Sequence, residues 1–174
     1  MRKGLKTLHL IGVAMFLGSI LGHISVGLIP GVDTETGAAL FARQAISAAT
    51  LSVTLPGLGL MLVTGAALYA KGGLPLGGRR WLLLHAGAGL LIALNAALVL
   101  APTGRELLGL AEQAAASGGA AGPGPGAGAA WARLHALEGR EALFGAVNVA
   151  LALAAIAIAV VKPRLGARRT PAGS

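Results

Sequence analysis

Four histidines are the side chains of this chain best suited to chemistry: His9, His23, His85 and His135. His9 and His85 each lie about one turn inside the same end of a long apolar stretch, whereas His135 precedes the last such stretch. His23 follows His9 by fourteen residues, which at 100° per residue returns it to within about 40° of the same helix face, about 21 Å farther along the axis. The sequence therefore predicts an inner pair, His9 with His85, and a weaker outer pair, His23 with His135.

The inner pair has the pattern of transmembrane haem ligation. Two neutral imidazoles on facing helices can hold a haem iron from both sides, and small residues beside them let the helices close on the flat macrocycle. Gly12 and Gly89 each lie one turn from a histidine of this pair. We therefore predict haem b as the cofactor, with its iron as the metal bound by His9 and His85, and Gly12 and Gly89 beside it.

Other interpretations of these histidines stay open. Near the membrane interface, His9 and His85 could instead cap helix ends or form hydrogen bonds between helices, and metal or proton traffic is a third alternative. Haem pockets are usually rich in aromatic residues, which make up only 3% of this chain. The outer pair is the weaker haem site because His135 is expected outside the hydrocarbon. No catalytic residue is predicted, and enzymatic activity stays an open question.

Four apolar stretches must position these side chains, at about residues 7–29, 46–70, 80–101 and 141–161. Each is long enough to cross a hydrocarbon core of about 30 Å as a helix. With 55% apolar and 11% charged residues, the chain has no room for a separate soluble domain. The sequence thus predicts an all-α bundle of four transmembrane helices, a single membrane domain over residues 1–174, and contact with the lipid bilayer.

Charges along the chain predict its orientation. Ten of the fourteen basic residues lie at the two termini and in the loop between the second and third stretches, and all six acidic residues lie in the other two loops. Because Lys and Arg resist translocation, both termini are expected in the cytoplasm of a multi-pass protein of the inner (cytoplasmic) membrane. The net charge of +8 is therefore juxtamembrane, which excludes nucleic acid as a partner.

Prolines and small residues predict where the helices bend and end. Pro56 is expected to bend the second helix, and Pro102 to end the third. Beyond Pro102, Thr103 and Glu106 have the spacing of a capping box for a short external helix. The Ala, Gly, Ser and Pro residues of about 114–130 predict a flexible external linker.

Polar and small residues inside the stretches predict helix packing. Asn95 and Asn148 are expected to face the bundle interior and to form hydrogen bonds with a neighbouring helix. Gly18 and Gly22 form a Gly-x-x-x-Gly pair, which permits close approach of another backbone. A membrane partner subunit or a homo-oligomer would fit this pair, and ordinary close packing is the alternative.

Short motifs spread over most of the chain carry a resemblance to known families: Lys6-Thr7-Leu8-His9, Arg43, Pro56 with Gly65, Trp81, and Val160-Val161-Lys162-Pro163. Together they resemble an uncharacterised family of predicted bacterial four-helix integral membrane proteins and, more distantly, the HemJ-type protoporphyrinogen IX oxidase. The second resemblance implies a bacterial inner-membrane protein with a b-type haem on His9. The HemJ-type pattern has a lysine where this chain has His85, and its later Tyr-His pair is absent. These departures weigh against protoporphyrinogen oxidation and keep a haem site with two histidine ligands.

Two functions of different classes follow from the sequence. In the first, the chain is an inner-membrane protein that binds b-type haem for redox chemistry or electron transfer. In the second, it is a non-catalytic membrane subunit or assembly factor, whose histidines only form hydrogen bonds between helices. The substrate, the electron donor and acceptor, the partner and the oligomeric state do not follow from the sequence.

Overall fold

A computed structural model describes residues 2–31, 36–72, 80–116 and 127–162 of the chain. The described residues form four continuous helices and no strand, so the predicted all-α class is confirmed. Each of the four is long and apolar enough to cross a membrane. In chain order the elements are α1 (Arg2–Gly27), α2 (Thr36–Ala49), the π-helical turn η1 (Thr50–Thr54), α3 (Leu55–Gly72), α4 (Arg80–Asn95), the π-helical turn η3 (Ala96–Leu100), α5 (Ala101–Ala116) and α6 (Ala127–Val161).

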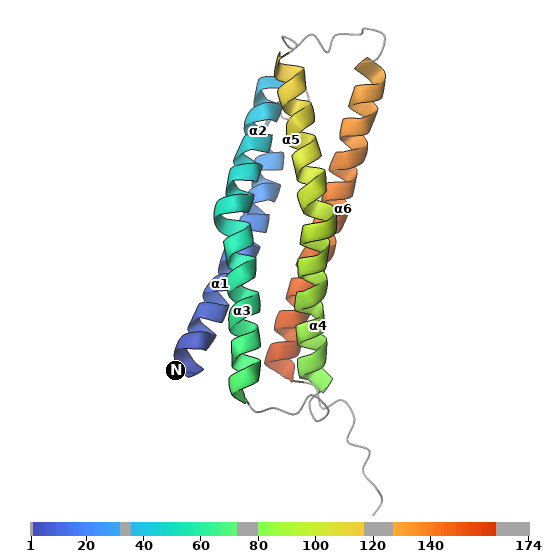
Figure 1. Cartoon of the computed structure of the whole chain (residues 1–174). Helices are drawn as coiled ribbons and strands as arrows, with labels where there is room; N and C mark the ends of the chain where they lie inside the picture. The colour runs from blue at the N-terminus through green and yellow to red at the C-terminus, as the bar shows by residue number, and fades with distance from the viewer. Residues whose placement is uncertain (1, 32–35, 73–79, 117–126, 163–174) are drawn as a thin grey trace, which may run out of the picture.

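The bundle is built from two helix pairs. Along one half of its length α1 packs against α3 and α4 packs against α6, whereas α3 and α4 barely touch each other. Along the other half, α2 packs against α5 and so joins the two pairs. The start of α1, the end of α3, the start of α4 and the end of α6 lie together at one end of the bundle (Figure 1). We call this the basic end, after its described charged residues: Arg2, Lys3, Lys6, Lys71, Arg80 and Lys162.

Each of the two central helices contains a π-helical turn shortly before a proline. In η1, the backbone N–H of Leu55 donates to the carbonyl of Thr50, five residues earlier, and the same spacing closes η3. One residue separates each turn from its proline, which is Pro56 after η1 and Pro102 after η3. Proline lacks an N–H, and its ring would clash with the carbonyl four residues earlier in an α-helix. The wider π turn accommodates the ring, and both helices continue through their prolines.

The prediction that the third helix ends at Pro102 is therefore wrong. The helix continues without a break from α4 through η3 into α5, and Thr103 lies within it at 2% exposure. The Thr103 hydroxyl donates to the carbonyl of Val99, 2.8 Å away, so it bonds back along the helix and caps no helix start. Glu106, the other half of the predicted capping box, forms an ion pair with Arg133 of α6.

Two helices begin well before the apolar stretches that they contain. The second helix begins at Thr36, well before residue 46, and the last helix begins at Ala127, well before residue 141. The predicted linker at 114–130 is helical at both of its ends, because α5 continues to Ala116, and residues 117–126 lie outside the described part. Alanine is the best helix former, so alanine-rich ends extend a helix beyond its apolar core.

Many large apolar side chains lie exposed on the surface of the bundle. Leu98, Val63 and Val160 are 68%, 69% and 76% exposed, which suits a surface in contact with lipid tails. Inside, Gly12 of α1 lies against the backbone of α3, where a Cβ on Gly12 would come within 2.7 Å of the Met61 nitrogen. Such close approach of backbones is how helices associate in lipid.

Candidate functional site

A cavity of about 350 Å³ lies between the two helix pairs, in the half of the bundle nearer the basic end. Helices α1, α3, α4 and α6 all contribute to its wall, which is almost entirely apolar. On the side of α3 and α4 its lining includes Leu62 and Leu90, which are 37% and 58% exposed. Because α3 and α4 barely touch, the cavity opens there toward the surrounding lipid. Its volume is in the range of small-molecule sites.

His9 enters this cavity from α1 and is held from behind by α3. Its Nδ1 lies 2.9 Å from the carbonyl oxygen of Met61 and 3.2 Å from the hydroxyl of Thr64. The Thr64 hydroxyl donates its own hydrogen to the carbonyl of Leu60, 2.5 Å away, so toward His9 it can act only as an acceptor. Both partners of Nδ1 are thus acceptors, and Nδ1 carries the proton.

His85 enters the cavity from α4 and is held in the same way by α6. Its Nδ1 lies 3.0 Å from the carbonyl oxygen of Ala155 and therefore also carries the proton. The two imidazole rings face each other across the cavity with centroids 6.2 Å apart and planes tilted by 56°. The structure thus brings together the two histidines that the sequence singled out as the inner pair.

Both histidines have the tautomer of a metal ligand. With the proton on Nδ1, each Nε2 has a free lone pair, and neither Nε2 forms a hydrogen bond within the described part of the chain. Metal-binding histidines usually donate their second N–H to a carbonyl or carboxylate, which fixes the ring. With ring centroids 6.2 Å apart, the two histidines can contribute to one site.

The donor set distinguishes between a bare ion and a macrocycle. Among the described residues, no group of three or more His, Cys, Asp or Glu side chains could hold a metal ion. Two imidazoles leave most positions of a bare ion to water, and an apolar cavity offers little water. A porphyrin brings its own equatorial nitrogens, so its iron needs from the protein only two axial ligands. The residues at this site fit a haem better than an isolated ion.

The two predicted glycines have different roles. Gly89 lines the cavity, in keeping with the expected position beside His85. Gly12 does not line it but lies buried against the backbone of α3. The residue that gives His9 its space is Gly65 of α3, where a Cβ would come within 3.3 Å of Cε1 of His9.

Three contributors to the site were missed at the sequence level: Thr64, Gly65 and Tyr69 of α3. Gly65 and Tyr69 line the cavity, four residues apart on one helix face, and Thr64 lies next to Gly65. Tyr69 is the single tyrosine of the chain and precedes the basic residue that ends its span. An unusual polar aromatic residue at that position was the available signal.

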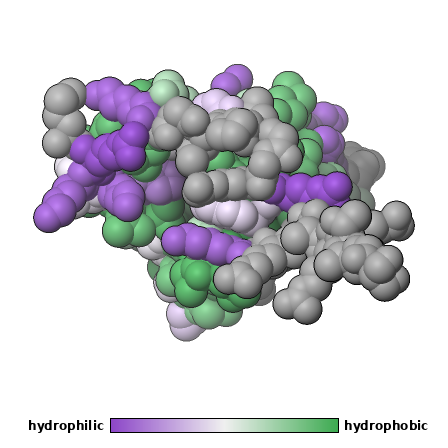
Figure 2. Space-filling model, turned by 90° about the horizontal axis from the view of Figure 1, so that it is seen from below, coloured by the Kyte–Doolittle hydropathy of each residue, from purple (hydrophilic) through white to green (hydrophobic). Residues whose placement is uncertain are grey.

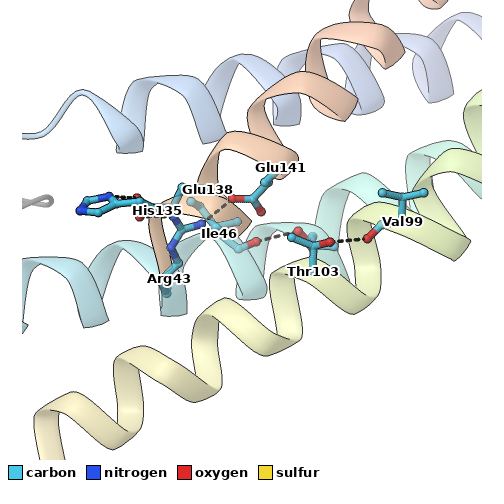
Figure 3. A network of polar contacts seen from close by, with 8 residues as sticks. Arg43, Ile46, Val99, Thr103, His135, Glu138 and Glu141 are labelled. Atoms are coloured by element: carbon cyan, nitrogen blue, oxygen red, sulfur yellow. Dashed lines mark hydrogen bonds and ion pairs between the residues drawn. The ribbon is translucent and has the colours of Figure 1, made fainter. Parts of the chain in front are cut away.

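The outer pair lies in different surroundings. His23 Nε2 is 3.4 Å from the hydroxyl of Ser19, whereas His135 is 59% exposed in its side chain and has Nδ1 3.3 Å from Glu138. Near His135, Arg43 of α2 reaches across to α6 and pairs with Glu138 at 2.8 Å and Glu141 at 2.5 Å (Figure 3). The structure thus places an ion-pair cluster at this end of the bundle, and haem ligation by His23 and His135 gains no support from it.

The predicted asparagines do join two helices. Asn95 of α4 donates through Nδ2 to Oδ1 of Asn148 at 2.8 Å and to the carbonyl of Phe144 at 2.9 Å, both on α6. Asn148 is 1% exposed. The hydrogen bond between neighbouring helices is confirmed, and it fixes α4 against α6 above the cavity.

A family profile described as predicted integral membrane protein (DUF2269) matches residues 3–163, almost the whole described chain. The chain belongs to this family. The DUF2269 match covers all four spans and both cavity histidines, and it confirms the expected integral membrane class. No curated protein and no solved structure matches this DUF2269 chain significantly. The likeness to the HemJ-type oxidase and a bacterial origin stay predictions.

Proposed function

We propose that this DUF2269 protein binds a b-type haem between His9 and His85 and transfers electrons within the membrane. The observation that carries the proposal is the arrangement of two imidazoles across an apolar cavity. Their centroids are 6.2 Å apart, their Nδ1 atoms bond to carbonyl oxygens, and their Nε2 atoms have no partner in the described chain. When bound, haem b would supply a one-electron ferric–ferrous couple.

The residues of the chain would set the conditions for that couple. Leu17, Ile92 and Ile156 are part of an apolar wall that excludes water from the site. The carbonyl groups of Met61 and Ala155 orient the two imidazoles and raise their basicity as ligands. Because each carbonyl belongs to the other helix of its pair, the two ligands are fixed before any cofactor binds.

The same proposal includes a location and an orientation. We place the protein in the bacterial inner membrane, with its basic end in the cytoplasm. The described cations Arg2, Lys71, Arg80 and Lys162 lie at that end, and the described acids lie toward the other. Lys and Arg are enriched in cytoplasmic loops, and this bias supports the assignment. Cysteine labelling from either side, at an added residue beside Lys162 or Glu112, would test it.

The decisive experiment is a reduced-minus-oxidised visible spectrum of detergent-purified protein from haem-supplemented cells. We expect a b-type α-band and Soret band in the natural protein and their loss in His9→Ala and His85→Ala. His135→Ala is the matched control, because its side chain is largely exposed far from the cavity, and it should keep both bands. A flat spectrum from the folded natural protein would overturn the proposal.

One observation favours the second candidate, a non-catalytic membrane subunit. The hydrogen bonds from His9 and His85 to Met61 and Ala155 also join helices within each pair and would do so without a cofactor. In addition, a Cβ at Gly18 or Gly22 would meet no atom within 4 Å, so this Gly-x-x-x-Gly pair is not used for packing within the described bundle and is open to a partner helix. A colourless preparation that co-purifies with a stoichiometric membrane partner would support this alternative.

A further inference from the structure

One polar side chain of the cavity is not used by the proposed haem ligation. Among the described residues that line the cavity, Tyr69 is the only one besides the two histidines whose side chain can donate a hydrogen bond. No hydrogen bond to its hydroxyl is found within the described chain. Tyr69 follows Gly65, which touches the His9 ring, by one helical turn in the direction of the basic end. Tyr69 therefore belongs to the part of the cavity wall nearer the basic end.

A lysine lies at the same level on the neighbouring helix. At 100° per residue, Lys6 lies within about 60° of His9 on α1, one turn closer to the basic end. Arg2, on this same face, donates to the carbonyl of Lys71 at 2.5 Å, which shows that the face lies against the end of α3. Lys6 has no ion pair or hydrogen bond in the described chain, so its ammonium group is available to a ligand.

The basic end as a whole has the charge that an anionic group would need. The four acidic residues of the described part, Glu106, Glu112, Glu138 and Glu141, lie on α5 and α6 in the half of the bundle away from this end. Seen from the basic end, hydrophilic side chains gather at several places around the rim, with apolar side chains between them (Figure 2). An apolar cavity with an unpaired hydroxyl, next to the basic end of the bundle, matches an amphipathic ligand with an apolar body and carboxylate groups.

We propose that Tyr69 and Lys6 form a carboxylate-binding mouth that holds the propionate groups of the porphyrin. This inference rests on the proposed haem function and adds the orientation of the ligand to it. Charged groups are expensive in the hydrocarbon core, so the propionates belong at the interface, where a lysine can extend its ammonium group toward them. A phenol hydroxyl and an ammonium group each donate to carboxylate oxygen in charge-assisted hydrogen bonds.

The test compares two porphyrins that differ only in their carboxylates. Protein expressed without haem supplementation is titrated with iron protoporphyrin IX and with its dimethyl ester, and the Soret band of the two-histidine complex reports binding. We expect Tyr69→Phe and Lys6→Met each to weaken binding of the free acid by about tenfold or more, the loss expected for one hydrogen bond to a charged group. Binding of the ester should be weaker in the natural protein and unchanged by either substitution.

Lys3→Met is the matched control, because this substitution removes the same charge from the same helix, at a position about 120° away from His9. It should leave both affinities unchanged. If the acid and the ester bind equally well, and neither Tyr69→Phe nor Lys6→Met changes this, then the proposed carboxylate-binding mouth is wrong and the proposed haem binding still stands. If no porphyrin forms a two-histidine complex, the proposed function itself fails.

A lipid could supply the same carboxylate chemistry, so a separate titration uses oleate. If oleate binds in a manner that depends on Tyr69 and displaces no porphyrin, the mouth serves a lipid and the assignment to propionates is overturned. Competition between oleate and the free acid, lost in Tyr69→Phe, supports one shared site for the carboxylates.

Discussion

His9 and His85 are equivalent positions in the two helix pairs of the bundle. Each lies on the first helix of its pair, and each donates through Nδ1 to a carbonyl on the second helix, Met61 for one and Ala155 for the other. The two rings then meet with centroids 6.2 Å apart. The spacing between the ligands is therefore set by how the two pairs pack against each other, through Phe16, Ile92 and Ala152 beside the cavity and through α2 and α5 farther away.

Replacing His85 with methionine tests its role as a ligand more sharply than its removal does. Methionine is itself an axial ligand of haem iron, and a His/Met pair raises the reduction potential relative to two histidines. We expect His85→Met to keep the haem and to show a more positive midpoint potential in a spectroscopic redox titration. Phe16→Leu, a change in the cavity wall, is the control and should keep the spectrum of two-histidine ligation.

The opposite result would also be informative. If His85→Met and His85→Ala retain identical spectra and potentials, then His85 is not a ligand, and its bond to Ala155 is purely structural. Loss of haem in His85→Met, together with normal folding, would show only that the thioether cannot reach the iron, and His85→Ala would then decide the question.

The contact between α1 and α3 predicts a large difference between two similar glycine substitutions. A Cβ at Gly12 would lie 2.7 Å from the backbone nitrogen of Met61, and backbone cannot move aside as a side chain can. Gly12→Ala should therefore destabilise the bundle by about 1–3 kcal/mol. Thermal unfolding in detergent, followed by helical circular dichroism, measures the change. Gly18→Ala, which meets no atom within 4 Å, should be neutral or slightly stabilising.

Hydropathy and charge were sufficient to predict the four spans, because burial in lipid demands long apolar helices regardless of how they pack. The shared depth of His9 and His85 also followed from counting residues along helices. The two rings meet because α1 and α4 face each other across a cavity. Hydropathy is the same for any arrangement of four helices, so it did not predict this meeting. The interhelical bond of Asn95 was predictable, whereas its partner was not.

The errors in the sequence prediction have a common physical cause. Pro102 was expected to end a helix because proline has no N–H to donate and its ring clashes with the carbonyl four residues earlier in an α-helix. A π turn removes that conflict, and no single residue type signals such a turn. The roles of Gly12 and Gly65 were likewise not readable from the sequence, since Gly12 lies three residues from His9 and Gly65 lies on a helix without a histidine. Only packing shows that Gly12 faces a backbone and Gly65 faces an imidazole.

The ion-pair cluster at the end away from the cavity is expected to hold the two helix pairs in register. Arg43 is only 12% exposed in its side chain and pairs with Glu138 and Glu141, which are 25% and 26% exposed. Arg43→Gln would remove the guanidinium shared by two partly buried carboxylates and leave Glu138 with His135 alone. We expect a loss of about 1–3 kcal/mol, less than for a fully buried pair. The readout is the unfolding midpoint in detergent.

Arg133→Gln is the control for this substitution. Its side chain is 67% exposed and its ion pair with Glu106 is open to solvent, so its loss should change stability by less than about 1 kcal/mol. If the spacing of the two ligands depends on this cluster, Arg43→Gln should also weaken haem binding, whereas Arg133→Gln should not. Equal effects of the two substitutions would contradict a special role for Arg43.

The bond between Asn95 and Asn148 predicts a measurable coupling between α4 and α6. Asn148→Ala removes one of the two acceptors of Asn95 Nδ2, and the carbonyl of Phe144 remains. Polar pairs between transmembrane helices contribute on average about 0.6 kcal/mol and at most about 1.7. A double-mutant cycle with Asn95→Ala and Asn148→Ala, read from unfolding in detergent, should give a coupling near the lower of these values, because Asn95 retains a partner. A coupling of zero would mean that the two amides stabilise the bundle independently, and the register of α4 on α6 would then rest on apolar packing around Ile92 and Ala152.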